Sequence, residues 1–365
     1  MRRHRLSALQ LEVTSRCTRL CAICARTVLG ERWLEGDFSD ELWRRLLPDL
    51  GLVRHLHLQG WGEPLLHPGL EAMAADAHAA GCRVGITSNG DLLREASGWL
   101  ASGTVDVLAL SVAGTDADNL RLRDGVRTTD VLEALAELAG RRASAVRPRL
   151  HVSYLLTRDN AGGLEAVVRA AASAGADAVL VSHLDFLPTP ELRQRAAWSE
   201  GGVNAAIREA LEAAAAAARS RRIELRLPTF EPQEMLTCAL DPRQILSVRW
   251  DGRVGPCVML NLPIDGPVPR CTRDGVLDVE PSVFGNLAEA TLSEILDGAG
   301  YRSFTEPFRR RMAADARYGD QALTASGWGA SRLAEIDRAF ESLEHAMADN
   351  PFPAACDGCP KASGW

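Results

Sequence analysis

The feature of this 365-residue sequence that most limits its fold is a repeated alternation of strand-like and helix-like segments. Short runs rich in β-branched and apolar residues predict strands at 9–13, 53–58, 83–88, 107–112, 150–156 and 178–184. Longer Ala-, Leu- and Glu-rich stretches predict helices near 39–50, 69–80, 91–101, 129–142 and 162–174. This alternation is typical of parallel β/α units, which form either a partial barrel or a doubly wound sheet. In both, the functional loops follow the carboxyl ends of the strands.

The pattern changes after residue 200. The expected elements there are a helix over 204–222, a strand over 223–228 and a hairpin over 247–258. The rest of the chain is rich in Pro, Gly and Cys, which predicts loops with two short helices. We therefore expect two domains, residues 1–230 and residues 231–365.

Composition excludes several classes of protein. The formal net charge of −7 argues against a nucleic-acid surface, which is normally basic. The basic N-terminal stretch lacks the apolar segment of a secretory signal, and no apolar run is long enough to span a bilayer. A cytoplasmic protein is therefore expected, in which thiols stay reduced. The nine cysteines then indicate metal ligands or catalytic thiols before disulfides.

The first cysteine group follows the first predicted strand directly. Cys17, Cys21 and Cys24 are spaced C-x3-C-x2-C, which is one ligand short of the usual zinc site. Three thiolates can hold three irons of a [4Fe–4S] cluster and leave the fourth iron open to a small molecule. The alternative is three incidental cysteines on a surface loop, which this spacing at this place disfavours.

This segment resembles the cluster motif of the radical SAM enzymes, C-x3-C-x-aromatic-C, with Ile23 in the aromatic position. The resemblance covers roughly residues 8–190 and implies a partial (β/α)6 TIM-like barrel. It also implies that S-adenosylmethionine (SAM) chelates the open iron and is reductively cleaved to a 5′-deoxyadenosyl radical. That chemistry belongs to the cofactor, while the protein orients the substrate.

Three further segments match the family in chain order. QGWGEPLLHP (59–68) is similar to the Gly-Gly-Glu segment that meets the SAM amino group, and ITSNG (86–90) is similar to the T-N-G turn. A serine at the end of the fourth strand and an arginine after it match weaker family positions at the SAM pocket and carboxylate. The SAM-binding residues that the resemblance implies are Gly60, Gly62, Glu63, Ser88, Asn89, Ser111 and Arg123.

The second cysteine group lies in the last third of the chain. It resembles the SPASM and twitch extensions of radical SAM enzymes, which carry auxiliary iron–sulfur clusters. The ligands implied for one auxiliary [4Fe–4S] cluster are Cys238, Cys257, Cys356 and Cys359. A four-cysteine zinc site is the alternative. Cys271 is either a further ligand or a spare thiol, and Cys82 is read as a buried strand-start cysteine.

The sequence offers only weak candidates for a proton acceptor. His57, His183 and Asp185 lie near the ends of predicted strands and could reach the cavity. A single histidine on a strand is more often a satisfied core or rim residue, so these three are weak candidates.

A fully ligated auxiliary cluster has no open iron for substrate, so its expected role is to move an electron. This favours oxidation of a sugar or aminocyclitol alcohol to a ketone, as in the radical SAM dehydrogenases that the chain resembles. The alternatives are maturation of a ribosomal peptide by crosslinking or epimerisation, and redox-neutral epimerisation or decarboxylation of a natural-product sugar. A non-catalytic scaffold is disfavoured by the intact cysteine motif and Glu63. The expected partners are a small-molecule substrate and a flavodoxin- or ferredoxin-type reductant, without nucleic acid or membrane.

Overall fold

The computed structural model describes residues 5–142, 147–199, 202–231, 235–272, 274–326 and 329–364. One large sheet has the strand order β12-β9-β8-β1-β2-β3-β4-β5-β6-β7. Its strands are β1 (Leu6–Leu11), β2 (Val53–Leu58), β3 (Arg83–Ser88), β4 (Val107–Val112), β5 (Arg149–Leu156), β6 (Ala178–His183), β7 (Glu224–Arg226), β8 (Ile245–Val248), β9 (Arg253–Gly255) and β12 (Gly285–Asn286). A separate ribbon pairs β10 (Val268–Cys271) with β11 (Val276–Val279).

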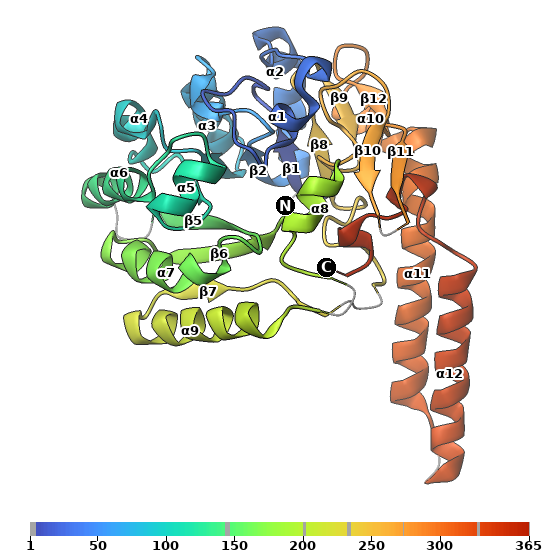
Figure 1. Cartoon of the computed structure of the whole chain (residues 1–365). Helices are drawn as coiled ribbons and strands as arrows, with labels where there is room; N and C mark the ends of the chain where they lie inside the picture. Colours follow the sequence, from blue (N-terminus) through green and yellow to red (C-terminus); the bar gives the residue numbers. More distant parts are fainter. Residues whose placement is uncertain are drawn as a thin grey trace.

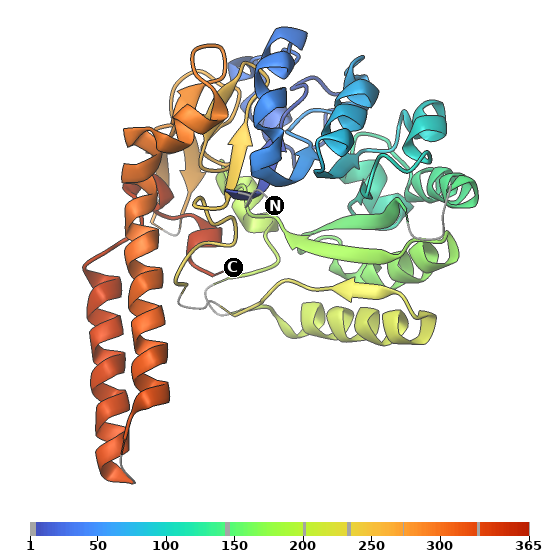
Figure 2. The same ribbon diagram turned by 180° about the vertical axis from the view of Figure 1, so that it is seen from behind.

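Helices follow most of the parallel strands and cover the outside of the curved sheet (Figures 1 and 2). The α-helices are α1 (Ala25–Leu29), α2 (Asp40–Leu46), α3 (Leu70–Ala79), α4 (Leu93–Leu100), α5 (Asp116–Leu122), α6 (Thr128–Arg141), α7 (Leu164–Ser173), α8 (Pro190–Arg195), α9 (Ala205–Arg221), α10 (Leu292–Asp297), α11 (Ala299–Thr324) and α12 (Ala330–Ala348). The short 3-10 helices are η1 (Gly30–Arg32), η2 (Leu47–Leu52), η3 (Pro64–Leu66), η4 (Ala161–Gly163), η5 (Ala354–Cys356) and η6 (Pro360–Ala362).

Strands β1 to β7 lie side by side in chain order and are all parallel. β7 forms one edge of the sheet and β12 the other, so the barrel is open. The predicted α/β class with a parallel sheet is confirmed, and the fold is that of a partial barrel.

The alternation of side chains along the strands separates the core from the interior of the barrel. Leu9 and Leu11 on β1 are fully buried in the main apolar core, whereas Gln10 between them points the other way. On β4 and β5, Ser111 and Ser153 are paired in register and line the interior. The helix-covered face is therefore apolar, and the inner face is polar enough to hold a ligand.

The C-terminal third begins by extending the same sheet. β8 pairs in parallel with β1, with Leu246 beside Leu9 and Val248 beside Leu11, and β9 returns antiparallel to β8. The hairpin turn uses Gly252, whose φ of 86° is the left-handed conformation that glycine adopts readily. This pairing places the chain after β9 beside the barrel. The domain boundary near residue 230 stays a prediction.

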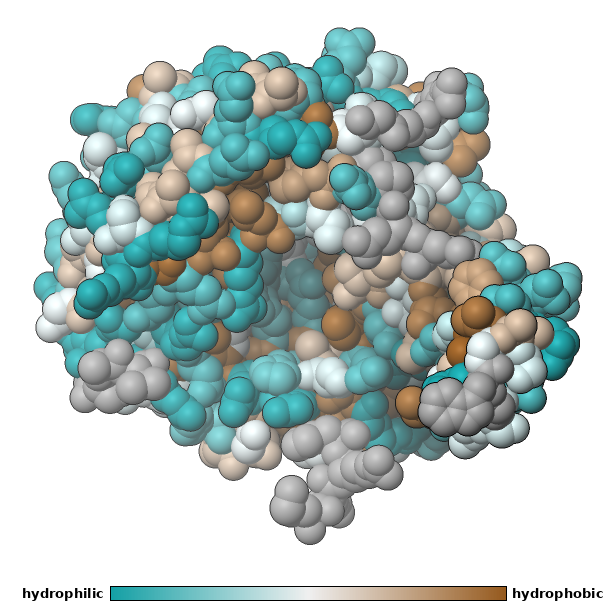
Figure 3. Space-filling view, turned by 90° about the horizontal axis from the view of Figure 1, so that it is seen from below, coloured by the Kyte–Doolittle hydropathy of each residue, from teal (hydrophilic) through white to brown (hydrophobic). Residues whose placement is uncertain are grey.

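The expectation of loops and two short helices near the C-terminus is wrong. α11 and α12 are long, pack against each other and project from the rest of the molecule (Figures 1 and 2). Ala314, Leu343 and Met347 form a buried cluster between them, which stabilises both helices although Pro307 interrupts the hydrogen bonding of α11. Seen from below, the pair of helices α11 and α12 lies end-on beside a hollow near the centre of the face (Figure 3).

Among the described residues, no helix combines the length and the apolar character that a membrane span requires.

Candidate functional site

The first three cysteines lie on the loop between β1 and α1. Arg26 Nη2 donates to the carbonyl oxygen of Cys17 at 3.0 Å, which fixes the start of the loop. Cys24 is the N-cap residue of α1, and its amide donates to the carbonyl oxygen of Cys21 at 3.1 Å. These two hydrogen bonds, one from a side chain and one from the backbone, both end on backbone carbonyl oxygens of the loop and hold it in a turn.

One pocket brings these cysteines together with the residues predicted to bind SAM. Its lining includes Cys17, Cys21, Cys24, Gly60, Gly62, Glu63, Ser88, Asn89, Ser111 and Arg123. Burial, together with the neighbouring Cys21 and Cys17, raises the pKa of Cys24 to about 11. Crowded, buried thiols do not ionise together unless a cation neutralises them, so this donor set fits an iron–sulfur cluster.

Glu63 is fully buried beside the cysteines, directly before η3. Its Oε1 accepts hydrogen bonds from Ser88 Oγ at 2.8 Å and the Leu65 amide at 3.1 Å, and its Oε2 accepts from the Asn89 amide at 2.7 Å. A carboxylate offers about four acceptor positions, so one remains open on Oε2. Burial raises the Glu63 pKa to about 7. A bound ammonium group would restore the charged form, which fits the amino group of SAM.

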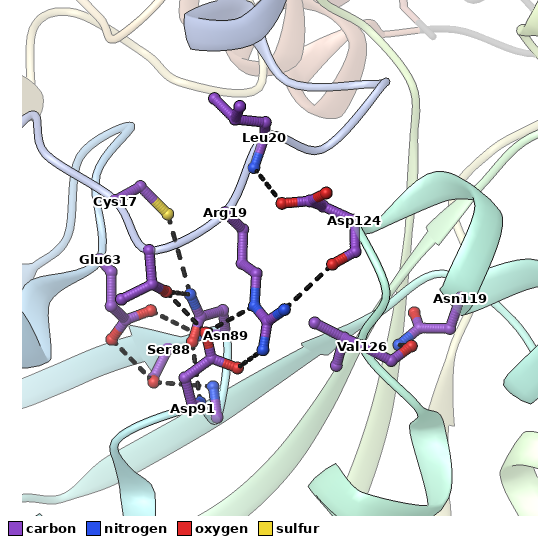
Figure 4. A network of polar contacts seen from close by, with 12 residues as sticks. Cys17, Arg19, Leu20, Glu63, Ser88, Asn89, Asp91, Asn119, Asp124 and Val126 are labelled. Atoms are coloured by element: carbon purple, nitrogen blue, oxygen red, sulfur yellow. Dashed lines mark hydrogen bonds and ion pairs between the residues drawn. The ribbon is translucent and has the colours of Figure 1, made fainter.

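A network of polar contacts ties the cysteine loop to the turn after β3 (Figure 4). Asp91 accepts from Arg19 Nε and Nη2, both at 2.7 Å, and from Thr18 Oγ1 at 2.6 Å. Asn89 Nδ2 donates to Thr18 Oγ1 at 3.0 Å and lies 3.8 Å from the sulfur of Cys17. Arg19 and Asp91 were not expected from the sequence, yet their charge-assisted bonds position two predicted segments of the site.

Gly62 lets the Glu63 segment approach the cysteine loop. A Cβ atom at Gly62 would lie 2.3 Å from the carbonyl oxygen of Thr14 and 2.5 Å from that of Arg16. Because both atoms belong to the backbone, they cannot move away without displacing the loop.

We therefore expect Gly62→Ala to lower both SAM cleavage and stability, the latter by about 1–3 kcal/mol, as overpacking does. Gly98→Ala is the matched control, because no atom lies within 4 Å of its added Cβ. Urea unfolding and 5′-deoxyadenosine formation by both variants test this. Equal effects of the two substitutions would contradict it.

The second cysteine group gathers at a separate place. Cys238 precedes β8, Cys257 follows β9, and Cys356 and Cys359 flank the turn between η5 and η6. Burial, together with the nearby Cys359 and Cys238, raises the pKa of Cys257 to about 12. Burial also raises the pKa of Cys356, with contributions from the other three thiols. Cys271 lines a different cavity, between β10 and α8.

The chemistry of these four thiols fits a fully ligated cluster, by the same reasoning as for the first group. Within the described ranges, no three Cys, His, Asp or Glu side chains stand close enough together to surround a single metal ion. In a cubane cluster, each thiolate binds a different iron.

Trp61 forms a wall between the two cysteine groups. It lines the first pocket, and its indole N–H donates to the carbonyl oxygen of Val258 at 3.3 Å. It packs in one apolar cluster with Cys257 and Phe186, whose ring centroid is 5.2 Å from that of Trp61. The residue inserted between the two glycines of the motif therefore joins the barrel to the cysteine-rich region.

The three weak candidates for a proton acceptor do not line the pocket. His57 Nε2 lies 3.0 Å from Thr87 Oγ1, and burial lowers the His57 pKa to about 4. His183 Nε2 donates to the carbonyl oxygen of Thr229 at 2.6 Å, and its ring faces the apolar side of β6. Asp185 is engaged in an ion pair. A catalytic role for any of them stays a prediction.

Several pocket residues were missed by the sequence analysis. Gln59, directly after β2, lines the pocket together with Ser153 on β5 and Ser182 on β6. Within the described part of the chain, neither serine hydroxyl makes a hydrogen bond, so both are available to a ligand. The period of two along β5 and β6 was the signal that could have identified them.

Comparison with known proteins defines the class of this fold and site. Residues 11–171 match the model of the radical SAM superfamily, and residues 238–319 match that of an iron–sulfur cluster-binding domain, SPASM. A radical SAM domain implies a [4Fe–4S] cluster and SAM, and a SPASM domain implies auxiliary clusters. The chain therefore contains a radical SAM domain and, C-terminal to it, a SPASM domain.

A curated relative is the "tungsten-containing aldehyde ferredoxin oxidoreductase cofactor-modifying protein" of Pyrococcus furiosus. It is 28% identical over 310 residues, which is 81% of this chain and 82% of the relative. Native anSMEcpe with bound AdoMet has a TM-score of 0.58 at 15% identity, covering 94% of this chain and 97% of anSMEcpe. Streptococcus suis SuiB bound to its precursor peptide SuiA has a TM-score of 0.58 at 13% identity, covering 82% and 67%. These structures share the fold.

Proposed function

We propose that this protein oxidises an alcohol carbon of a small polyol, sugar or aminocyclitol to a ketone. Cys17, Cys21 and Cys24 would hold the cluster that binds SAM, and Glu63 would accept a hydrogen bond from the SAM ammonium. Cys238, Cys257, Cys356 and Cys359 would hold one auxiliary [4Fe–4S] cluster. A ferredoxin- or flavodoxin-type protein would supply the electron that starts the reaction.

The observation that supports oxidation most directly is the second group of thiols. All four are half-buried, and the other three lie close enough to Cys356 to raise its pKa. With four cysteine ligands, a cluster has no open iron for substrate, which leaves electron transfer as its role. Trp61 lies between this group and the pocket, so substrate in the pocket would lie close to the electron acceptor.

When bound, the first cluster and SAM would supply a 5′-deoxyadenosyl radical that takes the hydrogen of the carbinol carbon, the auxiliary cluster would accept the remaining electron, and the hydroxyl proton would be released to solvent. The protein contributes position and exclusion of water. Ser153 and Ser182 offer free hydroxyl groups on the inner wall, and Gln59 adds an amide. These neutral donors and acceptors suit a substrate that carries several hydroxyl or amino groups.

Product analysis tests this function. The reconstituted enzyme would be incubated with SAM, a reductant and a panel of polyols and aminocyclitols deuterated at the carbinol carbons. We expect one substrate to give a ketone and deuterated 5′-deoxyadenosine in equal amounts. Deuterium transfer without a ketone, or with a product isomeric to the substrate, would contradict the oxidation and favour epimerisation.

A second candidate is modification of a peptide or of another enzyme's cofactor. The name of the Pyrococcus furiosus relative favours this candidate, because it describes a cofactor-modifying protein. The same incubation with precursor peptides or cofactor precursors in place of polyols would distinguish the two. Substrate-dependent formation of 5′-deoxyadenosine with only one class of molecule would decide between them.

A further inference from the structure

A buried arginine lies directly beneath the last two cysteines. Arg270 is on β10 and only 7% exposed. Its Nη1 donates to the carbonyl oxygen of Ala355 at 3.0 Å and also to that of Asp357, on either side of Cys356. A Cβ at Gly358 would lie 2.5 Å from Thr272 Cγ2 and 3.7 Å from Arg270 Cδ, so the turn packs closely against the β10–β11 ribbon. β10 and the C-terminal turns lie together in Figure 1.

Arg270 has no carboxylate partner among the described residues, unlike Lys361 and Arg243. Lys361 Nζ is 2.6 Å from Asp185 Oδ2, and Arg243 Nη2 is 2.7 Å from Asp241 Oδ2. Each of those pairs is close to neutral. Arg270 is therefore a buried positive charge beside the second cysteine group, without a compensating carboxylate in the described part of the chain.

An isolated buried charge is costly, so a structure that keeps one normally supplies a counter-charge. The two carbonyl oxygens that Arg270 binds belong to the residues before and after Cys356, so the guanidinium lies beside the backbone that carries this thiol. A thiolate or a thiolate-ligated cluster at this place would supply the counter-charge. Arg270, Cys359 and Asp185 also border one small cavity, whose single carboxylate is already paired.

We propose that Arg270 is the counter-ion of the auxiliary cluster and raises its reduction potential. A cubane with four thiolates carries net negative charge, and accepting one electron adds another. A guanidinium fixed beside the cluster stabilises the reduced state more than the oxidised state, and net charge is one of the terms that set such potentials. This role rests on the proposed function, in which the auxiliary cluster accepts one electron from the substrate radical.

The test uses the full chain with Cys17, Cys21 and Cys24 changed to alanine, so that only the auxiliary cluster is present. Its midpoint potential is measured by reductive titration followed by electron paramagnetic resonance. In this background, Arg270→Gln is expected to make reduction at least tenfold less favourable, about 59 mV for one electron. Arg270→Lys keeps the charge and is expected to shift the potential by less than half as much.

The double variant Asp185→Asn with Lys361→Met is the matched control, because it removes a neutral pair next to the same cysteines. We expect a smaller shift from it than from Arg270→Gln. An equal shift, or an unchanged potential in Arg270→Gln with its iron retained, would overturn the role of Arg270.

Two further outcomes are decisive. If Arg270→Gln loses the cluster, the Arg270→Lys variant becomes the test. A potential near that of wild type supports the role of Arg270. A potential at which reduction is at least tenfold less favourable, a shift of about 59 mV, overturns it. If the cysteine background itself holds no iron, there is no auxiliary acceptor, and the proposed oxidation fails together with this inference. An unaltered potential in a loaded variant would leave the proposed oxidation standing.

Discussion

Replacing any one of Cys17, Cys21 and Cys24 by alanine is expected to reduce SAM cleavage to below detection. The three thiols line one pocket with Glu63, and a cluster held by two of them would expose a second iron and lose its fixed position. The measurement is 5′-deoxyadenosine formation by each reconstituted variant under strong reductant.

Cys82→Ala is the matched control for this result. Cys82 is a buried thiol whose Sγ lies 3.4 Å from the carbonyl oxygens of Leu50 and Val53, far along the chain from either cysteine group. It is expected to cleave SAM at the wild-type rate after a small loss of stability. A triad variant that cleaves SAM as fast as Cys82→Ala would remove the basis for the SAM site.

Glu63→Gln is expected to lower SAM cleavage by about 10²–10³-fold, the typical cost of removing one preorganised polar group from a site. The substitution removes the negative charge that would meet the SAM ammonium. It also replaces one acceptor oxygen with an N–H2 group, which cannot accept from Ser88 or from the Asn89 amide. SAM affinity by equilibrium binding and 5′-deoxyadenosine formation should both fall.

Glu12→Gln provides an unusually close comparison. Glu12 is also fully buried, burial also raises its pKa to about 7, and its Oε1 accepts from the Trp61 amide at 3.0 Å. It does not line the pocket, and the glutamine oxygen can keep the bond to Trp61. We expect a smaller loss than for Glu63→Gln, about 10-fold, at the low end of what residues that orient others typically cost. Equal losses in Glu12→Gln and Glu63→Gln would show that burial of a carboxylate, rather than contact with SAM, is what matters.

Much of the barrel was predictable because its signals are local. The strands expected at 53–58, 83–88 and 107–112 are found with those bounds, since β-branched runs between helical stretches specify buried parallel strands. The cysteine and Gly-Gly-Glu segments were predictable for the same reason, since each is contiguous. Their meeting in one pocket follows from the shared rim of parallel strands.

Contacts between distant segments were not predictable from the sequence. Nothing local indicates that β8 pairs with β1, or that Arg19 binds Asp91 across 72 positions. The long helices α11 and α12 were missed because Pro307 and nearby glycines suggested breaks, whereas packing of one helix on the other overrides those preferences. Arg270 was missed because a single arginine in a Pro-rich stretch has no periodic signal.

The measurement that tests the central claim most directly is the iron and sulfide content after anaerobic reconstitution, for wild type and for the variant with Cys17, Cys21 and Cys24 all changed to alanine. Two separate [4Fe–4S] clusters predict about eight irons per wild-type chain and about four in the variant. A variant that holds zinc and no iron would contradict the account, because the C-terminal cysteines would then be structural and the proposed oxidation would lack its electron acceptor.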